Sequence, residues 1–407
     1  MPNKTLEKWE EKTINDVCIV ERGSSPRPIK DFITTDNNGV NWIKIGDCSG
    51  KYVTNTAQKI TQEGAKKSRY VKVGDFIISN SMSYGKPYIL KIDGYIHDGW
   101  FVLRLNNDLV NTDYFYYLLS SNYIREQYDA LATGAIVQNI SSDLIKKVTF
   151  KLPPLQEQQR IVKILNEAFE NIEKARQNVL QNLNNAKELF ESYLKKYFEI
   201  GNSAWDKYKL SAITTKIGSG ATPLGGRRAY IDSGISLIRS MNVYDREFIY
   251  EGLAHINETQ AEQLDVVTIQ ENDVLLNITG ASVARCCVVP NDVIPARVNQ
   301  HVSIIRPKQN IVLSRFLCYL LTSNYYKNKL LKDGEEGGAT RQALTKMGLE
   351  QFEVYIPKTL EEQQQIVQWL DELQEQTKKL EQIYEQKIKD LDELKQSILQ
   401  KAFNGEL

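Results

Sequence analysis

Two long stretches of the chain, residues 154–200 and 358–407, carry apolar residues at alternating steps of three and four. That spacing gathers the apolar side chains into one stripe along a helix and is typical of a coiled coil. The first stripe consists of Ile161, Leu165, Ala168, Ile172, Ala175, Val179, Asn182, Ala186, Leu189 and Tyr193. The second, shifted by 205 residues without a gap, consists of Ile366, Leu370, Leu373, Thr377, Leu380, Tyr384, Lys387, Leu391, Leu394 and Ile398. The pattern predicts two long helices with one heptad register.

An antiparallel pairing of these helices would place Ile161 opposite Ile398 and Tyr193 opposite Ile366. Asn182 then falls opposite Thr377, so that two polar residues of the stripe face each other and neither is buried alone. A seam from Ile161 to Tyr193 is roughly 50 Å long at about 1.5 Å per residue. The helices are therefore expected to act as a rod that connects the rest of the chain.

The segment before the first helix, residues 1–153, shows short apolar runs between Gly, Asp and Ser, which is the pattern of strands and turns. Residues 42–45, 75–78 and 100–103 are predicted strands. A helix is expected over residues 113–128, with Thr112 as its N-cap. This segment is predicted to be a mixed, strand-rich domain.

The segment between the helices, residues 201–357, repeats this plan. Trp205 corresponds to Trp9, Gly218 to Gly23, residues 270–276 to 73–78, and residues 320–325 to 118–123. The fold class is therefore α+β, with internal pseudo-two-fold symmetry. The chain is expected to divide into residues 1–153 (first domain), 154–200 (central helix), 201–357 (second domain) and 358–407 (C-terminal helix).

Charge is unevenly distributed along a chain of 407 residues whose 51 basic and 51 acidic side chains cancel. Residues 1–153 carry a net charge of +3, residues 154–200 of 0, residues 201–357 of +1 and residues 358–407 of −4. An acidic helix binds phosphate poorly, so any contact with a nucleic acid is expected from the two strand-rich domains and not from the C-terminal helix.

Several classes of function are disfavoured by the sequence. The chain has no Walker A motif, and it lacks the Asp/Asn-Pro-Pro-Tyr/Phe loop of adenine methyltransferases. Its five cysteines show no CxxC spacing and its three histidines no paired spacing, which argues against a disulfide framework, a metal site or a catalytic triad. No apolar run is long enough to cross a membrane, and the charged N-terminus does not resemble a secretory signal, so a cytoplasmic binding protein is expected.

The start of each long helix and the end of the chain resemble a known family. The first helix opens with LPPLQEQQRIV from Leu152, the second with LEEQQQIV from Leu360, and the chain ends in SILQKAFNGEL. These motifs resemble the DNA-specificity subunits of type I restriction-modification enzymes, and the resemblance covers the whole chain. One departure is that Ile356-Pro357-Lys358-Thr359-Leu360 holds one residue more than the first copy.

The resemblance implies a non-catalytic subunit that binds double-stranded DNA and reads a bipartite, asymmetric site, with one half for each target-recognition domain. It further implies two methylation subunits as partners and two restriction subunits in the cleaving complex. S-adenosylmethionine would then bind to the methylation subunits, so this chain is expected to hold no cofactor and no metal. The paired helices are expected to set the spacer between the half-sites.

Polar loops that recur at matching places in both domains are the candidate contacts with DNA. Arginine suits guanine, and asparagine or glutamine suits adenine, because each can make two hydrogen bonds to a base edge in the major groove. In the first domain the candidates are Ser24, Ser25, Arg27, Lys44, Asn80, Ser81, Tyr84, Lys86, Gln138 and Asn139. In the second they are Ser219, Thr222, Arg227, Arg228, Arg239, Asn242, Asn277, Thr279, Ser282, Arg297, Asn299, Gln300, His301, Thr340, Arg341 and Gln342.

Two other functional hypotheses are compatible with parts of the sequence. A scaffold that joins proteins through the coiled coil explains the stripe but not the two duplicated, loop-rich domains. The recognition part of a fused enzyme would need catalytic motifs, which the sequence lacks. For any single loop, a solvated turn without a partner is the plain alternative to a DNA contact.

Overall fold

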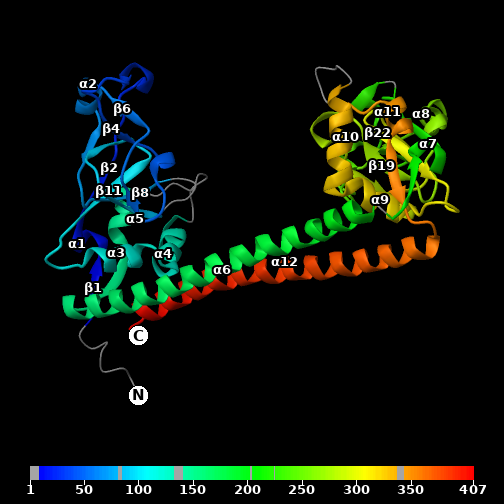
Figure 1. The fold of residues 1–407 in the computed structure, drawn as a ribbon. Coiled ribbons are helices and arrows are strands. Elements are labelled where there is room, and N and C mark those ends of the chain that lie inside the picture. The colour runs from blue at the N-terminus through cyan, green and yellow to red at the C-terminus, as the bar shows by residue number, and fades with distance from the viewer. Residues whose placement is uncertain (1–8, 81–84, 133–140, 202–203, 224, 337–342) are drawn as a thin grey trace. The chain divides into compact units, whose positions relative to one another are not determined.

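A computed structural model describes residues 9–80, 85–132, 141–201, 204–223, 225–336 and 343–407 (Figure 1). The chain forms two compact units. The first comprises residues 1–179 and 386–407, and the second comprises residues 180–385. Each unit thus contains one strand-rich domain and parts of both long helices, α6 (Leu155–Gly201) and α12 (Leu360–Phe403).

The first unit is built on three sheets. The short strands β1 and β12 pair antiparallel and close the domain where it meets α6. The sheets are β1 (Glu10–Thr13) with β12 (Thr149–Leu152); β3 (Ile33–Thr34), β6 (Gln58–Ile60), β4 (Val40–Ile43), β10 (Gly94–Ile96) and β7 (Arg69–Val71); and β2 (Cys18–Arg22), β11 (Trp100–Leu105), β8 (Phe76–Ser79), β9 (Pro87–Leu90) and β5 (Tyr52–Val53). Its shorter helices are α1 (Ile14–Val17), α2 (Gln62–Lys66), α3 (Thr112–Leu119), α4 (Asn122–Ala132) and α5 (Ser142–Lys147).

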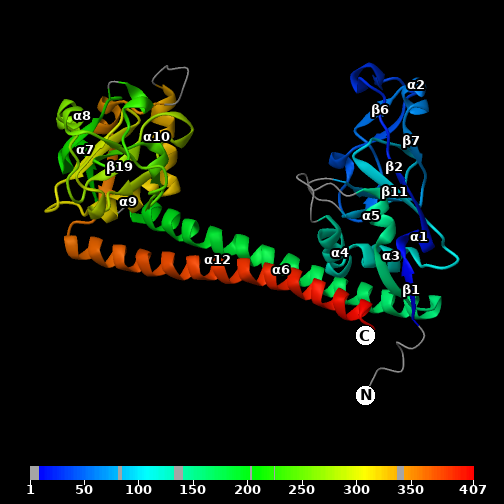
Figure 2. The same cartoon turned by 180° about the vertical axis from the view of Figure 1, so that it is seen from behind.

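The second unit repeats this plan (Figure 2). Its strands are β13 (Asp206–Lys209) with β23 (Glu353–Ile356); β14 (Thr214–Ser219), β22 (Val302–Pro307), β19 (Val274–Asn277) and β20 (Cys286–Val288); β18 (Ala254–Ile256), β15 (Ile235–Ile238) and β21 (Ala296–Val298); and β16 (Val243–Tyr244) with β17 (Glu247–Phe248). Its shorter helices are α7 (Leu210–Ile213), α8 (Glu258–Gln263), α9 (Ser314–Thr322), α10 (Asn324–Glu336) and α11 (Lys346–Gln351). The predicted α+β repeat is confirmed.

The predicted strands and the predicted helix of the first domain can be compared directly with the structure. Residues 42–45, 75–78 and 100–103 fall on β4, β8 and β11, shifted by at most two residues. The predicted helix over residues 113–128 is in fact two helices, α3 and α4, and its cap is Asn111 instead of Thr112. The Asn111 amide oxygen accepts hydrogen bonds from the backbone N–H groups of Asp113 and Tyr114, at 3.0 and 3.1 Å.

The correspondence between the two repeats is corrected at one glycine. Gly23 was matched to Gly218, but the structure matches it to Gly220. A Cβ atom on Gly23 would lie 1.9 Å from the His97 carbonyl oxygen, and one on Gly220 would lie 1.7 Å from the Val298 carbonyl oxygen. Both positions follow the first long strand of the domain and require glycine because the backbone of a neighbouring loop passes too close for any side chain.

A buried glutamine joins each domain to its long helix. The backbone N–H of Asn111 donates to Oε1 of Gln158, and that of Leu313 donates to Oε1 of Gln363, at 2.8 and 2.9 Å. Both glutamine side chains are fully buried, and their Nε2 groups donate to backbone carbonyl groups of the domain and the helix start. This explains why both helices open with a glutamine at the fourth position: it satisfies backbone groups that would otherwise be buried without partners.

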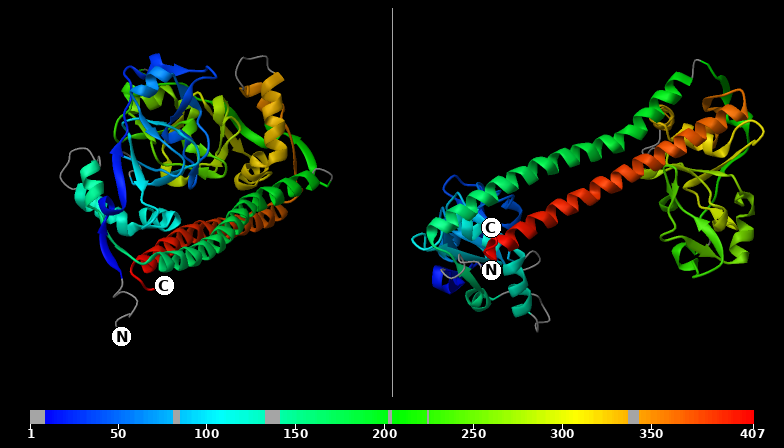
Figure 3. Two further views of the ribbon diagram at one scale, coloured as in Figure 1. Left: turned by 90° about the vertical axis from the view of Figure 1, so that its left-hand side faces the viewer. Right: turned by 90° about the horizontal axis from the view of Figure 1, so that it is seen from below.

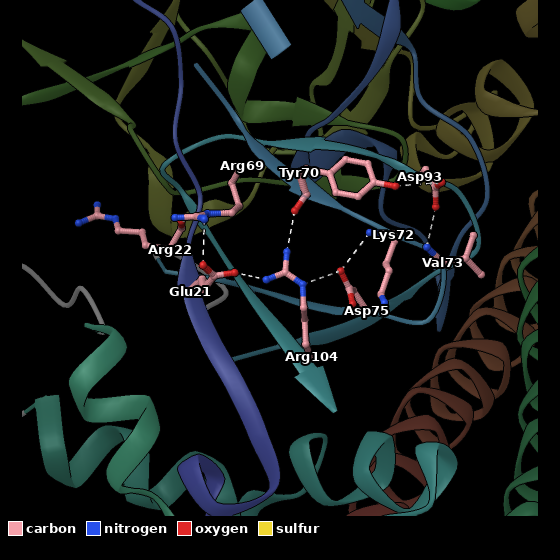
Figure 4. Close-up of polar contacts among 9 residues, drawn as sticks. All are labelled: Glu21, Arg22, Arg69, Tyr70, Lys72, Val73, Asp75, Asp93 and Arg104. Atoms are coloured by element: carbon pink, nitrogen blue, oxygen red, sulfur yellow. Dashed lines mark hydrogen bonds and ion pairs between the residues drawn. The ribbon is translucent and has the colours of Figure 1, made fainter. Parts of the chain in front are cut away.

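An arginine–aspartate pair ties together strands of each domain. In the second domain Arg306 holds Asp273 through two hydrogen bonds of 2.7 and 2.8 Å. In the first domain Arg104 lies between Asp75, at 3.4 Å, and Glu21, which also binds Arg69 (Figure 4). Such pairs fix the turn before β8 or β19 against the neighbouring strand β11 or β22.

The helices α6 and α12 lie side by side and run in opposite directions, as predicted (Figure 3). In the first unit, Ile161 and Leu165 share a hydrophobic core with Phe115 and Phe403. In the second unit, α6 and α12 contribute to a core that includes Phe198, Leu194, Ile366, Leu370 and Phe316. Each domain is therefore packed onto both helices, and its core is continuous with the seam.

The predicted stripe is wrong in the second half of α6. Leu189 and Tyr193 are 39% and 45% exposed. The buried residues there are Leu183, Ala186, Phe190, Leu194 and Phe198. The cause is the globular domain: the ring of Phe198 packs on Phe316 of α9 at 5.6 Å, so α6 turns this face inward.

The predicted register is also wrong. The side chain of Arg160 donates to the Leu407 backbone at 2.6 Å, and Tyr193 packs its ring on Trp369 at 5.9 Å, so residues opposite α6 lie nearer the C-terminus than expected. Asn182 is exposed and does not share a polar layer with Thr377. The buried Thr377 hydroxyl donates to the Leu373 carbonyl oxygen of its own helix at 3.0 Å instead.

Candidate nucleic-acid interface

In the first domain, three predicted residues converge on one backbone turn that follows β10. The hydroxyl of Ser25 donates to Asp98 Oδ1, and Arg27 Nη2 lies 3.0 Å from Asp98 Oδ2. The amide of Asn80 donates to the Asp98 carbonyl oxygen at 3.0 Å. The Arg27 side chain is 83% exposed, so Asp98 orients a guanidinium group that still faces solvent. A recess of about 310 Å³ lies beside it, lined by Ser25, Pro26, Arg27, Ile29, Trp42, His97 and Asp98.

The protonation states in this recess follow from its contacts. Burial raises the pKa of Asp98, but hydrogen bonds from Ser25, from the backbone and from Arg27 outweigh it and hold the pKa below its ordinary value. Burial also lowers the pKa of His97, although the Asp98 charge opposes this. The Gly99 N–H donates to His97 Nδ1 at 2.9 Å, which fits a neutral imidazole. The recess therefore presents an anionic acceptor, a cationic donor and a neutral ring.

In the second domain, four predicted residues form a hydrogen-bonded chain. Thr222 Oγ1 donates to Gln300 Oε1 at 2.6 Å, Gln300 Nε2 lies 3.0 Å from His301 Nε2, and His301 Nδ1 lies 2.6 Å from Thr279 Oγ1. Thr222 and Gln300 are exposed, whereas His301 and Thr279 are half-buried. The inner members thus hold the exposed glutamine amide in a defined orientation, which is the arrangement that base reading requires.

Beside this chain lies a recess of about 430 Å³, lined by Ser240, Met241, Tyr244, Thr279, Gly280, Ala281, Ser282, Arg285 and His301. The Arg285 guanidinium lies 4.2 Å from the centre of the Tyr244 ring. Sequence reasoning missed Tyr244, Arg285, Met241, Trp42 and Asp98. The available signal for Arg285 was its position after the Asn277 loop, which matches that of Lys86 after the Ser79 loop.

Four predicted residues turn their side chains into the protein. Asn242 and Asn277 are fully buried, and Arg297 and Asn299 are 8% exposed. The Asn242 amide donates to the Ile249 carbonyl oxygen, that of Asn277 to the Ser240 carbonyl oxygen, and Arg297 binds Asp265 and the Ala261 carbonyl oxygen. These side chains shape the loops, and their burial keeps them from contact with a base edge.

The remaining predicted residues are placed as follows. Arg239 is half-buried, donates to the Gly252 carbonyl oxygen and lies over the Tyr230 ring at 5.3 Å. Ser24, Lys44 and Ser282 are half-buried, and Lys86, Ser219 and Arg228 are exposed. Arg227 belongs to the short helical turn Gly226–Ala229. Ser81, Tyr84, Gln138, Asn139, Thr340, Arg341 and Gln342 lie outside the described residues.

Other kinds of site are not found in the described part of the chain. There, no group of three or more His, Cys, Asp and Glu side chains is arranged to hold a metal ion. All five cysteines are free. No helix within the described ranges combines the length and the apolar character needed to span a bilayer.

Two strand-rich domains, each packed on α6 and α12 and each with a cluster of hydrogen-bonded polar side chains, are the arrangement expected of a DNA-recognition subunit with two reading domains. The comparisons with known proteins agree. The profile of the type I restriction modification DNA specificity domain matches residues 6–182 and again residues 188–390. The chain therefore belongs to this family and carries two copies of its domain, as predicted.

Relatives support this assignment, and solved structures share the fold. The specificity subunit of the Escherichia coli type I restriction enzyme EcoBI is 26% identical over 75% of this chain and 68% of the relative. The MjaVIII specificity subunit of Methanocaldococcus jannaschii is 22% identical over 80% of this chain and 77% of its own. The HsdS subunit of Thermoanaerobacter tengcongensis shares the fold, with a TM-score of 0.58 and 21% identity over 100% of this chain and 99% of that one. A second solved chain comes from a structure that addresses complex assembly and conformational transition of the type I R-M system. It has a TM-score of 0.75 and 22% identity to this chain, and the match covers 100% of both chains.

Proposed function

We propose that this protein reads a bipartite, asymmetric DNA site, with one half contacted by residues 1–153 and the other by residues 201–357. The observation that carries the proposal is the chemical difference between two clusters at related places in the repeats. The first offers Arg27 beside Asp98, and the second offers Gln300 held by Thr222 and His301. Because the donors and acceptors differ, the two half-sites should differ in sequence.

Within each domain, the exposed side chains of these clusters are the proposed contacts. Arg27 and Gln300 are proposed to read base edges. Arg228 and Arg285 carry positive charge on loops of the second domain and are proposed to bind phosphate groups. Lys86 lines a separate pocket and is not proposed as a phosphate contact. No direct contact is proposed for Asn242, Asn277, Arg297 and Asn299, because their side chains are buried within the protein.

Replacing Gln300 should change only one half of the recognised sequence. We expect Gln300→Ala to cost on the order of 1 to 3 kcal/mol of discrimination at one or two base pairs, since a paired contact with one base edge is lost. Selection from a random duplex library, with the chain assembled with its methylation subunit, measures both half-sites at once. Arg27→Ala is the reciprocal variant and should alter the other half. A selected sequence without a split consensus, or equal changes in both halves, would contradict the proposal.

The chain is further proposed to be non-catalytic and to recruit two methylation subunits, with two restriction subunits in the cleaving complex. S-adenosylmethionine would bind to the methylation subunits. Support comes from the internal repeat, since two similar domain-and-helix units offer two similar surfaces. Its relatives are named as specificity subunits of restriction enzymes.

The mass of the purified methylating complex tests this stoichiometry. We expect one copy of this chain with two methylation subunits, and S-adenosylmethionine bound only when those subunits are present. Native mass spectrometry gives the copy number, and calorimetry with the isolated chain gives the control for the cofactor. An active complex with a single methylation subunit would rule out the two-fold arrangement.

A further inference from the structure

A pocket of about 420 Å³ lies in the first unit, away from the recess beside Arg27. Its walls come from the start of β9, the link between α3 and α4, and the last turns of α12. Three cations line it, namely Lys86, Arg125 and Lys395. Tyr128 also lines it, and its buried hydroxyl group has no hydrogen-bond partner among the described residues.

The matching place in the second unit is occupied by the protein itself. The turn between β16 and β17 inserts Asp245 and Arg246 there. Asp245 forms an ion pair with Lys327 of α10, and Arg246 forms one with Glu191 of α6. The Arg246 guanidinium also lies 5.0 Å from the centre of the Phe190 ring, and its side chain is only 13% exposed.

Each partner of that turn has a counterpart in the empty pocket of the first unit. Lys327 corresponds to Arg125, because both follow a Ser-Asn-Tyr segment. The backbone N–H of each donates to the carbonyl oxygen of the serine in that segment. On the long helices, which correspond without gaps, Phe190 corresponds to Lys395 and Glu191 to Gln396. Arg125 thus retains the positive charge of Lys327, which binds a carboxylate in the second unit. The acid Glu191 is replaced by the neutral amide Gln396, and the ring of Phe190 is replaced by the cation Lys395.

The first unit cannot fill this pocket with its own turn. The residues before β5, Ser49 to Lys51, include no acid, and Lys51 instead binds Asp113 at 2.6 Å. Within the described part of the chain, Lys86, Arg125 and Lys395 form no ion pair. The single acid in the lining, Asp392, lies 3.8 Å from Arg176. Among the described residues, three cations thus line this pocket against one acid.

We propose that this pocket is a docking site for an acidic segment of another protein, whose carboxylate groups bind Arg125 and Lys395. The second unit shows the chemistry of the occupant, since a protein turn with an aspartate fills the same place there. The walls favour a peptide over a nucleic acid because they include the apolar surfaces of Tyr116, Tyr117 and Leu399 and the acid Asp392. In the second unit Asp245 and Arg246 fill the matching place, so one such segment binds per chain.

A peptide built on the turn of the second unit tests the proposal. The probe is a fluorescent, head-to-tail cyclised peptide with the sequence of residues 243–248 bearing Arg246→Glu. The arginine is changed to an acid because its partners in the second unit, Glu191 and Phe190, correspond to Gln396 and the cation Lys395 in the pocket. Fluorescence anisotropy with the full chain should give one peptide per chain. Arg125→Ala should weaken binding on the order of tenfold, as expected for one charge-assisted hydrogen bond. The same peptide with Asp245→Asn should bind more weakly than the first.

Lys332→Ala is the matched control, since it removes one exposed positive charge from α10 of the second unit. It should leave peptide binding unchanged. Equal losses for Arg125→Ala and Lys332→Ala would mean that the peptide senses only net charge, and the proposal would fail. Displacement of the peptide by equimolar duplex DNA or inorganic phosphate would overturn the proposal in favour of a phosphate site. A ratio of two peptides per chain would contradict a single pocket per chain.

Discussion

Adding one heptad to both α6 and α12 should lengthen the spacer between the two half-sites by about three base pairs and leave the half-sites unchanged. The insertions belong between Val179 and Leu180 and between Glu385 and Gln386, which are the boundaries of the two units along the chain. Seven residues restore the positions of the stripe, so both units keep their contacts. The helices grow by roughly 10 Å at about 1.5 Å per residue, which equals about three base-pair steps of 3.4 Å.

Affinity should fall in the lengthened protein even though its sequence preference holds. Three base-pair steps also rotate the duplex by more than a quarter of a turn at about 10 base pairs per turn, so the DNA must twist or bend to meet both domains. Selection of preferred sites from a random library decides the matter. A heptad in α6 alone is the control. It shifts one part of α6 by seven residues relative to α12, so the two units cannot both keep their contacts, and binding should be abolished. An unchanged spacer would show that something other than the helices separates the domains.

Removing Arg306 should destabilise the second unit by on the order of 3 to 5 kcal/mol, the usual cost of leaving a buried charge without its partner. Asp273 is fully buried, and Arg306 supplies two of its hydrogen bonds. Urea unfolding of Arg306→Ala measures the loss, and DNA selection should show that the half-site read by the second domain is lost first. The half-site read by the first domain should remain, because each unit has its own core.

Arg315 offers a matched control in the same unit. Its guanidinium also contacts an aspartate, Asp371, at 2.8 and 2.9 Å, but its side chain is 54% exposed. Arg315→Ala should therefore cost no more than about 1 kcal/mol. The double variant Arg306→Met with Asp273→Leu should recover most of the stability, since no unpaired charge stays buried. If Arg306→Ala costs no more than Arg315→Ala, then the pair at Asp273 does not hold the domain together.

The candidate interface was only partly predictable from residue type. Arg27, Gln300 and His301 are candidates because arginine, glutamine and histidine on matched polar loops suit base reading, and the structure brings them into hydrogen-bonded clusters. Asn277 is a candidate by the same rule, yet its side chain is buried and its amide N–H donates to the Ser240 carbonyl oxygen. A polar residue at the end of a strand serves equally to satisfy buried backbone groups, and sequence pattern does not distinguish the two uses. Asp98 was missed because an acid is a poor direct contact for DNA, although it orients Arg27.

The duplicated plan, the two long helices and the family were determined by the sequence alone, because a gapless apolar stripe and the buried glutamine at each helix start leave a local signature. Which face of α6 is buried was decided only by the tertiary structure. Phe190 and Leu194 are buried and Tyr193 is not, because α9 competes with α12 for the helix surface. The open pocket at Arg125 was likewise hidden, since it depends on a turn that carries Asp245 in one repeat and no acid in the other. Contacts between segments distant in the chain carry no periodic pattern, so only their packing reveals them.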